Sequence, residues 1–274
     1  MTRFLCTNCG FWQSAPTAPV SCPVCTDFRH TPPEVGFLFL TEAEAARTAH
    51  CSWEEGGDAG VWAFSCDPRF GIGPRGYLLA HPAGNVFFDG TSWYGPEALD
   101  WLASRGGMRW LSASHPHAYG ALWQLQERFD PTVAVQVRDL PWTNDFWVTW
   151  PFDDRLELAP GLELIHTGGH FDGHSVLYWA EKRLLFAGDM LKFHSDGERL
   201  TGISTHKAFN RHIPMSHAEV ARYRAVVEPL DFEAVYTTFD RAACTRDMAL
   251  RMFDAQLAGP PFFGPHPVPQ EVAR

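Results

Sequence analysis

The chain has 274 residues, of which 45% are apolar, including 21 Phe and 11 Trp, so it can bury a large core. Its 32 acidic and 22 basic residues give a formal net charge of −10 at pH 7, which disfavours binding to nucleic acid or to an anionic membrane. No apolar run is long enough to cross a bilayer and the N-terminus has no signal-peptide pattern, so we expect a cytoplasmic protein.

Residues 1–40 are the first predicted domain, a small unit built on four cysteines. Cys6 and Cys9 form one Cys-x-x-Cys pair, and Cys22 and Cys25 form a second pair after 12 intervening residues. A segment this short cannot bury enough apolar surface to fold unaided, whereas two such turns present four thiolates to one tetrahedral ion. The spacing therefore predicts a metal site that folds the segment, and the three other cysteines are expected to be small buried residues.

Zinc is the metal expected at the four cysteines, in a unit that resembles a zinc ribbon. The Cys22-Pro-Val-Cys25 pair is also similar to a rubredoxin knuckle, which would hold iron, although Thr26 stands where rubredoxins carry glycine. The segment has only Arg3 and Arg29 as basic residues. We therefore expect it to dock on the main domain or on a dimer partner, and not on nucleic acid.

The second predicted domain covers residues 41–274. Thr41 and Glu44 form a capping-box pattern, which predicts a helix over 41–49. Residues 54–76 are rich in Gly and Pro, which predicts a loop around the short aromatic run Val61-Trp-Ala-Phe64. The elements expected next are a hairpin over 77–89, a helix over 96–104, a strand over 109–113, a helix over 118–128 and a strand over 132–137.

The second half of this domain reads as strands followed by helices. The elements expected are strands over 156–158, 162–166, 175–179 and 183–187, a helix over 216–227, a strand over 233–237, a helix over 242–257 and an irregular tail. Strands with helices in both halves predict sheets covered by helices, an α/β sandwich.

Three imidazoles and one carboxylate follow predicted strands. His115 and His117 stand in a turn stiffened by Pro116, and two histidines at this spacing reach one ion from a turn but not from a helix. His170 lies in a Gly-rich turn, and Asp189 follows an apolar run. Three nitrogen ligands with one carboxylate suit zinc or iron(II) better than magnesium or calcium.

With these motifs the chain resembles the metallo-β-lactamase-fold superfamily of metal-dependent hydrolases, over about residues 70–257. That family carries His-x-His-x-Asp-His after one strand, Gly-His in a later loop and Gly-Asp after another strand. The matching motifs here are His115-Pro-His117, Gly169-His170 and Gly188-Asp189, and Asp89-Gly90 is similar to the family's early Asp-Gly turn. The resemblance implies a four-layer αββα sandwich, preceded here by the four-cysteine unit.

The chain also departs from the family pattern. The family's second-metal aspartate and histidine would fall on Tyr119 and Gly120, and its last histidine near Thr238, where no histidine stands. The resemblance therefore implies a single ion, zinc or iron, with a position left for water or substrate. Its ligands would be His115, His117, His170 and Asp189. The residues that could rebuild a second position by type are Asp172, His174, His206, His212 and Asp240.

The resulting hypothesis is a metal-dependent hydrolase that attacks an ester, thioester or lactone with activated water. Asp189 or Asp172 would orient or deprotonate that water, and the Tyr119 hydroxyl would stabilise an oxyanion. We expect a small-molecule substrate, with pocket walls formed by loops over 142–150 and 190–215, and we leave a homodimer open. Two alternatives remain: an iron-dependent redox protein or oxygenase, and a non-catalytic metal-binding relative.

Overall fold

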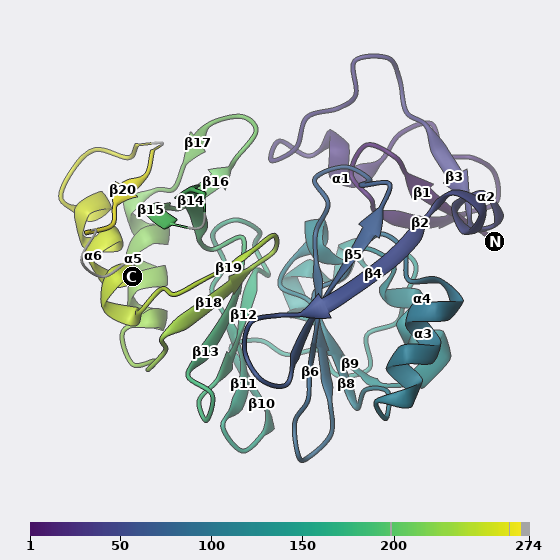
Figure 1. Ribbon diagram of the computed structural model, residues 1–274. Coiled ribbons are helices and arrows are strands. Elements are labelled where there is room, and N and C mark those ends of the chain that lie inside the picture. The colour runs from purple at the N-terminus through teal and green to yellow at the C-terminus, as the bar shows by residue number, and fades with distance from the viewer. Residues whose placement is uncertain (198, 263, 270–274) are drawn as a thin grey trace. The chain divides into compact units, whose positions relative to one another are not determined.

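The computed structural model describes residues 1–197, 199–262 and 264–269 (Figure 1). The chain divides into two compact units, Met1–Phe152 and Asp153–Arg274. The predicted boundary after residue 40 lies inside the first unit. Residues 198, 263 and 270–274 of the predicted domain 41–274 lie outside the described residues. Over the described part of the chain, no helix is both long and apolar enough to cross a membrane.

The N-terminal part of the first unit is a three-stranded antiparallel sheet. Its order is β2–β1–β3, with β1 Thr2–Cys6, β2 Trp12–Ala15 and β3 Phe39–Thr41. A one-turn helix, α1 Pro23–Thr26, follows Cys22. Helix α2 Glu42–Thr48 begins with the predicted capping box, in which Thr41 Oγ1 accepts from the Glu44 amide and the Glu44 carboxylate accepts from the Thr41 amide.

A six-stranded sheet forms the rest of the first unit. It contains, in spatial order, β4 His50–Glu55, β5 Val61–Asp67, β6 Gly76–Leu79, β7 Val86–Phe88, β8 Trp110–Ser112 and β9 Thr132–Ala134. Strands β4 to β7 are antiparallel, and β7, β8 and β9 are parallel. The predicted loop over 54–76 is wrong in part, because its aromatic run belongs to strand β5, which continues to Asp67 and hydrogen-bonds to neighbours on both sides. This pairing outweighs the Gly and Pro residues that flank the strand.

Two helices cover one face of this sheet, α3 Gly95–Ser104 and α4 Leu122–Phe129 (Figure 1). Their apolar side chains, among them Leu102 and Leu125, belong to one core with Phe64, Leu78 and Leu111 of the strands. Helix α4 starts later than predicted, since Pro116–Ala118 forms a 3-10 turn and Gly120 has a φ of +48°. A second 3-10 helix spans Val137–Trp142.

The second unit contains the other six-stranded sheet. Its spatial order is β10 Arg155–Ala159, β11 Leu162–His166, β12 Ser175–Trp179, β13 Leu184–Gly188, β18 Ala234–Thr237 and β19 Arg241–Ala242. The four strands predicted in succession are confirmed as β10 to β13. Only β13 and β18 are parallel neighbours. Because β12 runs antiparallel to β13, the start of β12 and the end of β13 lie at the same edge of the sheet.

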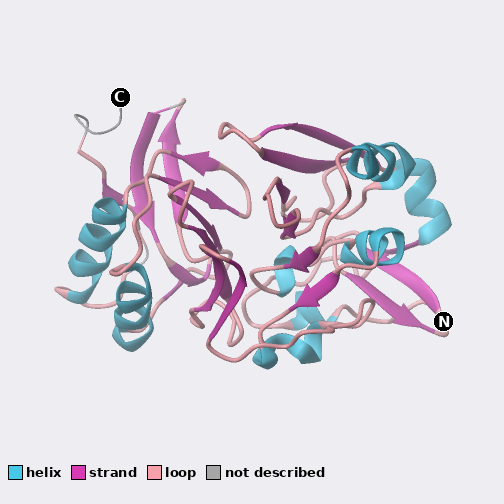
Figure 2. Cartoon of the chain, turned by 90° about the horizontal axis from the view of Figure 1, so that it is seen from below, coloured by secondary structure: helices cyan, strands magenta, loops and turns pink. Residues whose placement is uncertain are grey.

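Helices α5 His217–Val227 and α6 Arg246–Leu257 lie side by side on one face of this sheet (Figures 1 and 2). Alternate strand residues such as Ile165, Val176 and Leu185 pack with them, as the two-residue period of a strand requires. Helix α5 begins with a capping box made by Ser216 and Glu219, and its range confirms the helix predicted over 216–227.

Three strands and a short hairpin complete the second unit. The strands are β14 Lys192–Asp196, β15 Arg199–Ser204 and β20 His266–Pro267, and the hairpin is β16 His206–Ala208 with β17 Ile213–Pro214. Segment 190–215 is therefore mostly strand and not the loop that we predicted, and the tail contains a short strand. Phe193 and Ile203 explain the difference, because both are buried in the core that α5 and α6 cover.

Candidate metal centres

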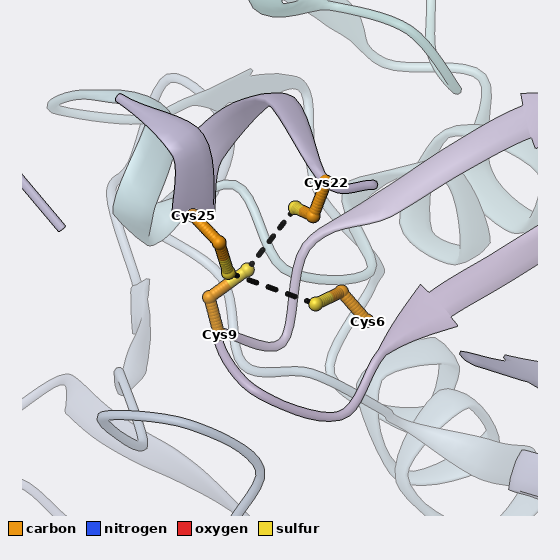
Figure 3. A group of neighbouring side chains, drawn as sticks. All are labelled: Cys6, Cys9, Cys22 and Cys25. Carbon is orange, nitrogen blue, oxygen red and sulfur yellow. Dashed lines mark hydrogen bonds between the residues drawn. The ribbon is translucent and has the colours of Figure 1, made fainter. Parts of the chain in front are cut away.

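The four predicted cysteines come together in the first unit, and their side chains point toward one another (Figure 3). The Sγ atoms of Cys6 and Cys25 are 3.7 Å apart, and those of Cys9 and Cys22 are 3.6 Å apart. All four Sγ atoms lie within 4.8 Å of one another, and all four side chains are buried.

These distances fit one tetrahedral ion. Bonds of about 2.3 Å from zinc to sulfur place neighbouring sulfurs about 3.8 Å apart, whereas a disulfide would bring two sulfurs to about 2.05 Å. All four cysteines are free thiols. Burial raises the pKa of the Cys9 thiol, and the neighbouring sulfurs raise it further, so thiolates are stable together here only with a cation. The prediction that the four cysteines form one group is confirmed, and the group could hold a metal ion as in a zinc ribbon.

The cysteine segment packs onto the rest of the first unit. The Trp12 indole donates to the carbonyl of Ser92 at 2.8 Å, and its ring lies 5.4 Å from that of Trp123. Gly10 has a φ of +81°, and a Cβ there would lie 2.2 Å from Ser92 Oγ, so only glycine fits this turn. We expected this segment to dock either on the main domain or on a dimer partner. The structure shows it packed on the rest of the first unit.

The first histidine pair follows β8. His115 and His117 are both buried, their rings lie 5.2 Å apart and edge to face, and their nearest donor atoms lie within 4.8 Å. Ser114 precedes them and donates from its amide at 2.6 Å and from its hydroxyl at 2.8 Å to Asp89 Oδ1. The Ser114 hydroxyl also lies 2.8 Å from His115 Nδ1. These bonds hold the turn in one conformation.

Asp89 reaches this turn because β7 and β8 are parallel neighbours, so the residues that follow them meet at one edge of the sheet. The sequence marked Asp89 only as part of a turn, and did not predict this contact. Its amide also bonds the carbonyl of Ser112 at 3.0 Å, which ties the ends of the two strands together. Asp89 is therefore the residue that positions the histidine turn.

Tyr119 and Gly120 occupy the places of the family's missing ligands. The Tyr119 ring lies in the core of the first unit, 5.2 Å from Phe146 and perpendicular to it, and burial raises the pKa of its hydroxyl. A Cβ on Gly120 would lie 2.2 Å from the carbonyl oxygen of Thr91. No larger residue, and so no histidine, fits at position 120 without moving the backbone.

The second pair belongs to the second unit. His170 lies in the loop before β12, Asp189 follows β13, and His170 Nε2 is 3.5 Å from Asp189 Oδ2. Both are buried. The amide of His170 donates to Tyr223 Oη at 3.0 Å, and that hydroxyl donates to the carbonyl of Gly168 at 3.0 Å. Helix α5 thus supports the loop through one phenol, a contact that the sequence did not indicate.

His174 supports Asp189 from behind. The Asp189 amide donates to His174 Nε2 at 3.2 Å, and His174 Nδ1 lies 2.6 Å from Thr167 Oγ1. With Nε2 accepting, Nδ1 carries the proton. The His174 ring therefore supports the backbone of Asp189. His174 was one of the residues named for a second metal position, and both of its ring nitrogens already make these contacts.

The other residues named from the sequence lie in varied surroundings. Asp172 has an exposed side chain, and its carbonyl oxygen lies 2.8 Å from His166 Nε2. His206 is buried beside Phe209, and burial lowers its pKa to about 3. His212 is exposed, and Asp240 accepts from the hydroxyl of Thr237.

Known proteins match the chain over much of its length. A sequence model described as the metallo-beta-lactamase superfamily matches residues 97–245, more than half of the chain. The uncharacterized protein YmaE of Bacillus subtilis (strain 168) is 27% identical over 256 residues, which cover 88% of this chain and 90% of that protein.

Solved structures give the same fold. The mono-zinc form of the metallo-beta-lactamase FIM-1 from Pseudomonas aeruginosa matches with a TM-score of 0.54 and 13% identity, over 76% of this chain and 97% of that one. A protein called TTHA1623, in a di-iron-bound form, matches with a TM-score of 0.52 and 20% identity, over 66% of this chain and 94% of that one. These likenesses confirm the predicted αββα metallo-β-lactamase-like fold class.

Proposed function

The chain belongs to the metallo-beta-lactamase superfamily, and on that premise we propose that it is a hydrolase that depends on a single metal ion. Each unit carries one pair of buried donor residues in the order that the superfamily uses. The proposed ligands are His115, His117, His170 and Asp189, each of which offers one donor atom. The observation that carries the proposal is that every one of these pairs is buried and held by dedicated hydrogen bonds.

The donor set agrees with the metal that the superfamily implies. Three imidazoles and one carboxylate suit zinc or iron(II), and water or substrate would take a fifth position on the ion. The contact between Ser114 Oγ and His115 Nδ1 is of the kind that fixes imidazole orientation in metal sites. His115 is held through Ser114, and His170 through its own amide.

The proposal of one ion rests on Gly120 and Tyr119. Gly120 lies too close to the backbone of Thr91 for a side chain, and Tyr119 has its ring in an apolar core. Neither residue can take the part of the family's second-metal ligands. Of the residues named as replacements, His174 is bound to the Asp189 amide.

We propose water attack on an ester, thioester or lactone of a small molecule. A bound zinc or iron(II) ion would lower the pKa of a coordinated water and polarise a carbonyl. Asp189 then has a second carboxylate oxygen with which to orient that water and accept its proton, and Asp172 is the alternative base. We keep Tyr119 as the proposed oxyanion donor. A Tyr119→Phe variant with unchanged kcat would remove it from that role.

Metal analysis with matched variants tests this function. We expect two metal equivalents in the purified protein and hydrolysis of an aryl ester, a thioester or a lactone in a substrate panel. His170→Ala should lose one equivalent and the activity, whereas His50→Ala, a change at an exposed histidine, should lose neither. Retention of both equivalents by His170→Ala would defeat the proposed centre.

The same purified protein distinguishes the hydrolase from the redox alternative through its visible absorption. The four-cysteine group and the His/Asp donors both accept iron, and one structural neighbour was solved with two irons bound. We propose zinc at the four cysteines, so the protein should be colourless. Visible absorption from iron bound to thiolates would instead support the redox protein or oxygenase.

The setting of the reaction is also a proposal. Four free thiols arranged for a metal are characteristic of a reducing compartment, so we propose the cytoplasm. The net charge of −10 argues against nucleic acid as a partner. A small molecule is therefore the proposed ligand. A homodimer stays open, and light scattering of the purified protein decides it.

A further inference from the structure

The cysteine segment places a histidine against one of the proposed metal ligands. His30 follows Cys25 by five residues and is buried, with 4% of its surface exposed. Its ring lies 5.5 Å from the ring of His117, at an interplanar angle of 73°. This edge-to-face contact is nearly the same as that between His117 and His115. His117 is therefore flanked by one ring from its own turn and one from the cysteine segment.

The loop that carries His30 is held firmly. Both carboxylate oxygens of Asp27 accept from one guanidinium nitrogen of Arg29 at 3.0 Å, and the Arg29 amide also donates to Asp27 at 2.9 Å. The amide of His30 donates to the carbonyl of Asp27 at 3.1 Å. The amide of Thr31 donates to His30 Nδ1 at 2.8 Å, which fixes the direction of the ring.

One side chain joins this loop to the cysteine group. The Asn8 amide nitrogen donates to Cys25 Sγ at 3.3 Å and to the carbonyl of Thr31 at 3.1 Å. Asn8 stands between Cys6 and Cys9, so it moves with the first pair of thiols. A metal that orders the four sulfurs therefore also orders Asn8, and through it the residue next to His30.

We propose that His30 is a positioning residue of the His/Asp metal centre, and that the four-cysteine unit acts on that centre through it. The inference rests on the proposed function, since it takes His117 to be a ligand. A ligand whose ring is packed on both sides loses less freedom when an ion binds, so the ion binds more tightly. The cysteine unit then has a task beyond its own folding.

Cobalt substitution tests the inference because it reports on the two centres separately. Cobalt bound to four thiolates gives intense sulfur-to-metal charge-transfer bands and strong d–d bands, whereas cobalt bound to imidazoles and a carboxylate adds weaker d–d bands and no such charge transfer. Titration of the metal-free full-length chain with cobalt therefore yields one affinity for each centre. It also yields the d–d spectrum of the His/Asp centre, which a loss of general stability would not shift.

Three variants give the outcome. His30→Ala should weaken cobalt binding at the His/Asp centre by about 10-fold or more and shift its d–d bands, because supporting residues of metal ligands typically act on this scale. The charge-transfer bands should stay as in the wild type. His30→Phe keeps a ring against His117 and should lose less than threefold. His50→Ala, in the same unit but exposed, should match the wild type.

The inference is overturned if His30→Ala binds cobalt at the His/Asp centre within twofold of the wild type, or if His30→Phe is as weak as His30→Ala. Its failure is distinct from that of the proposed function. A wild type that binds one cobalt equivalent with charge-transfer bands and no second equivalent would remove the hydrolytic centre itself, before any His30 variant is compared.

Discussion

In the first unit the proposed ligands are held by a charged group, whereas in the second unit they are held by neutral ones. Asp89 accepts two hydrogen bonds from Ser114 and so sets the His115–His117 turn. In the second unit, Tyr223 binds the His170 loop and His174 binds the Asp189 amide. A carboxylate supports its turn through strong charge-assisted bonds, whereas the Tyr223 phenol supports its loop at a point where the backbone of Gly169 passes very close to it. The second arrangement therefore depends on glycine.

The largest effect is expected where that backbone passes closest. Gly169 has a φ of +82°, and a Cβ there would lie 2.4 Å from Tyr223 Oη. Gly169→Ala combines a left-handed conformation with a steric clash, and should lower the free energy of unfolding by about 4 kcal/mol. Urea unfolding measures it. Gly197→Ala is the control, since its φ is +61° but no atom of the described residues beyond its chain neighbours lies within 4 Å of the added Cβ, and it should cost about 1 kcal/mol.

The charged anchor of the first unit comes next. Asp89→Ala removes the acceptor of two buried bonds and should cost about 3 kcal/mol, with a loss of metal from the His/Asp centre. Asp89→Asn keeps an acceptor oxygen, and asparagine tolerates the φ of +60° at this position. It should cost only about 1 kcal/mol. Equal losses in the two variants would show that the charge, and not the hydrogen bonds, holds the turn.

The neutral anchor should be weaker when only its hydroxyl is removed. Tyr223→Phe removes the acceptor of the His170 amide and one of the two hydroxyl donors to the Gly168 carbonyl, at a cost of about 2 kcal/mol. Tyr178→Phe is the matched control. That hydroxyl also bridges two backbone groups, both of Asp231, but it is accessible to water, so the expected cost is below about 1 kcal/mol. Similar losses would mean that burial does not decide the strength of this support.

Asp145 is a second buried carboxylate of the first unit. Its replacement by Asn should change the stability in the opposite direction to the replacement of Asp89. Neither oxygen of Asp145 has a hydrogen bond to another described residue, and burial raises its pKa well above the usual value, although Arg3 opposes this shift. A raised folded pKa means that stability is greatest at acid pH and falls as the pH rises through the ordinary value of about 3.8.

Asp145→Asn should therefore stabilise the protein at pH 7, where Asp89→Asn destabilises it. The gain should be the smallest of these effects and should vanish toward pH 4. Thermal unfolding of both variants from pH 4 to pH 8 measures this difference. A gain that is independent of pH would show that Asp145 is not a source of electrostatic cost.

Local patterns predicted much of the chain. The two Cys-x-x-Cys turns, the capping box at Thr41 and the strands β10 to β13 follow from spacing within a few residues, because the groups that interact are near neighbours in the chain. The prediction of a loop over 54–76 was wrong in part because β5 is stabilised by strands on either side of it and not by its own composition.

The supports of the proposed centre were decided by tertiary structure alone. Asp89 meets Ser114 only because β7 and β8 are parallel neighbours, and Tyr223 meets His170 only because α5 packs on the second sheet. His30 meets His117 across 87 residues. The sequence by itself determines which types of residue follow each strand, because the residues at the end of a strand are its neighbours in the chain. Which side chains stand behind them depends on the packing of distant segments, because hydrogen bonds and ring contacts form only between groups that the completed fold brings within a few ångströms.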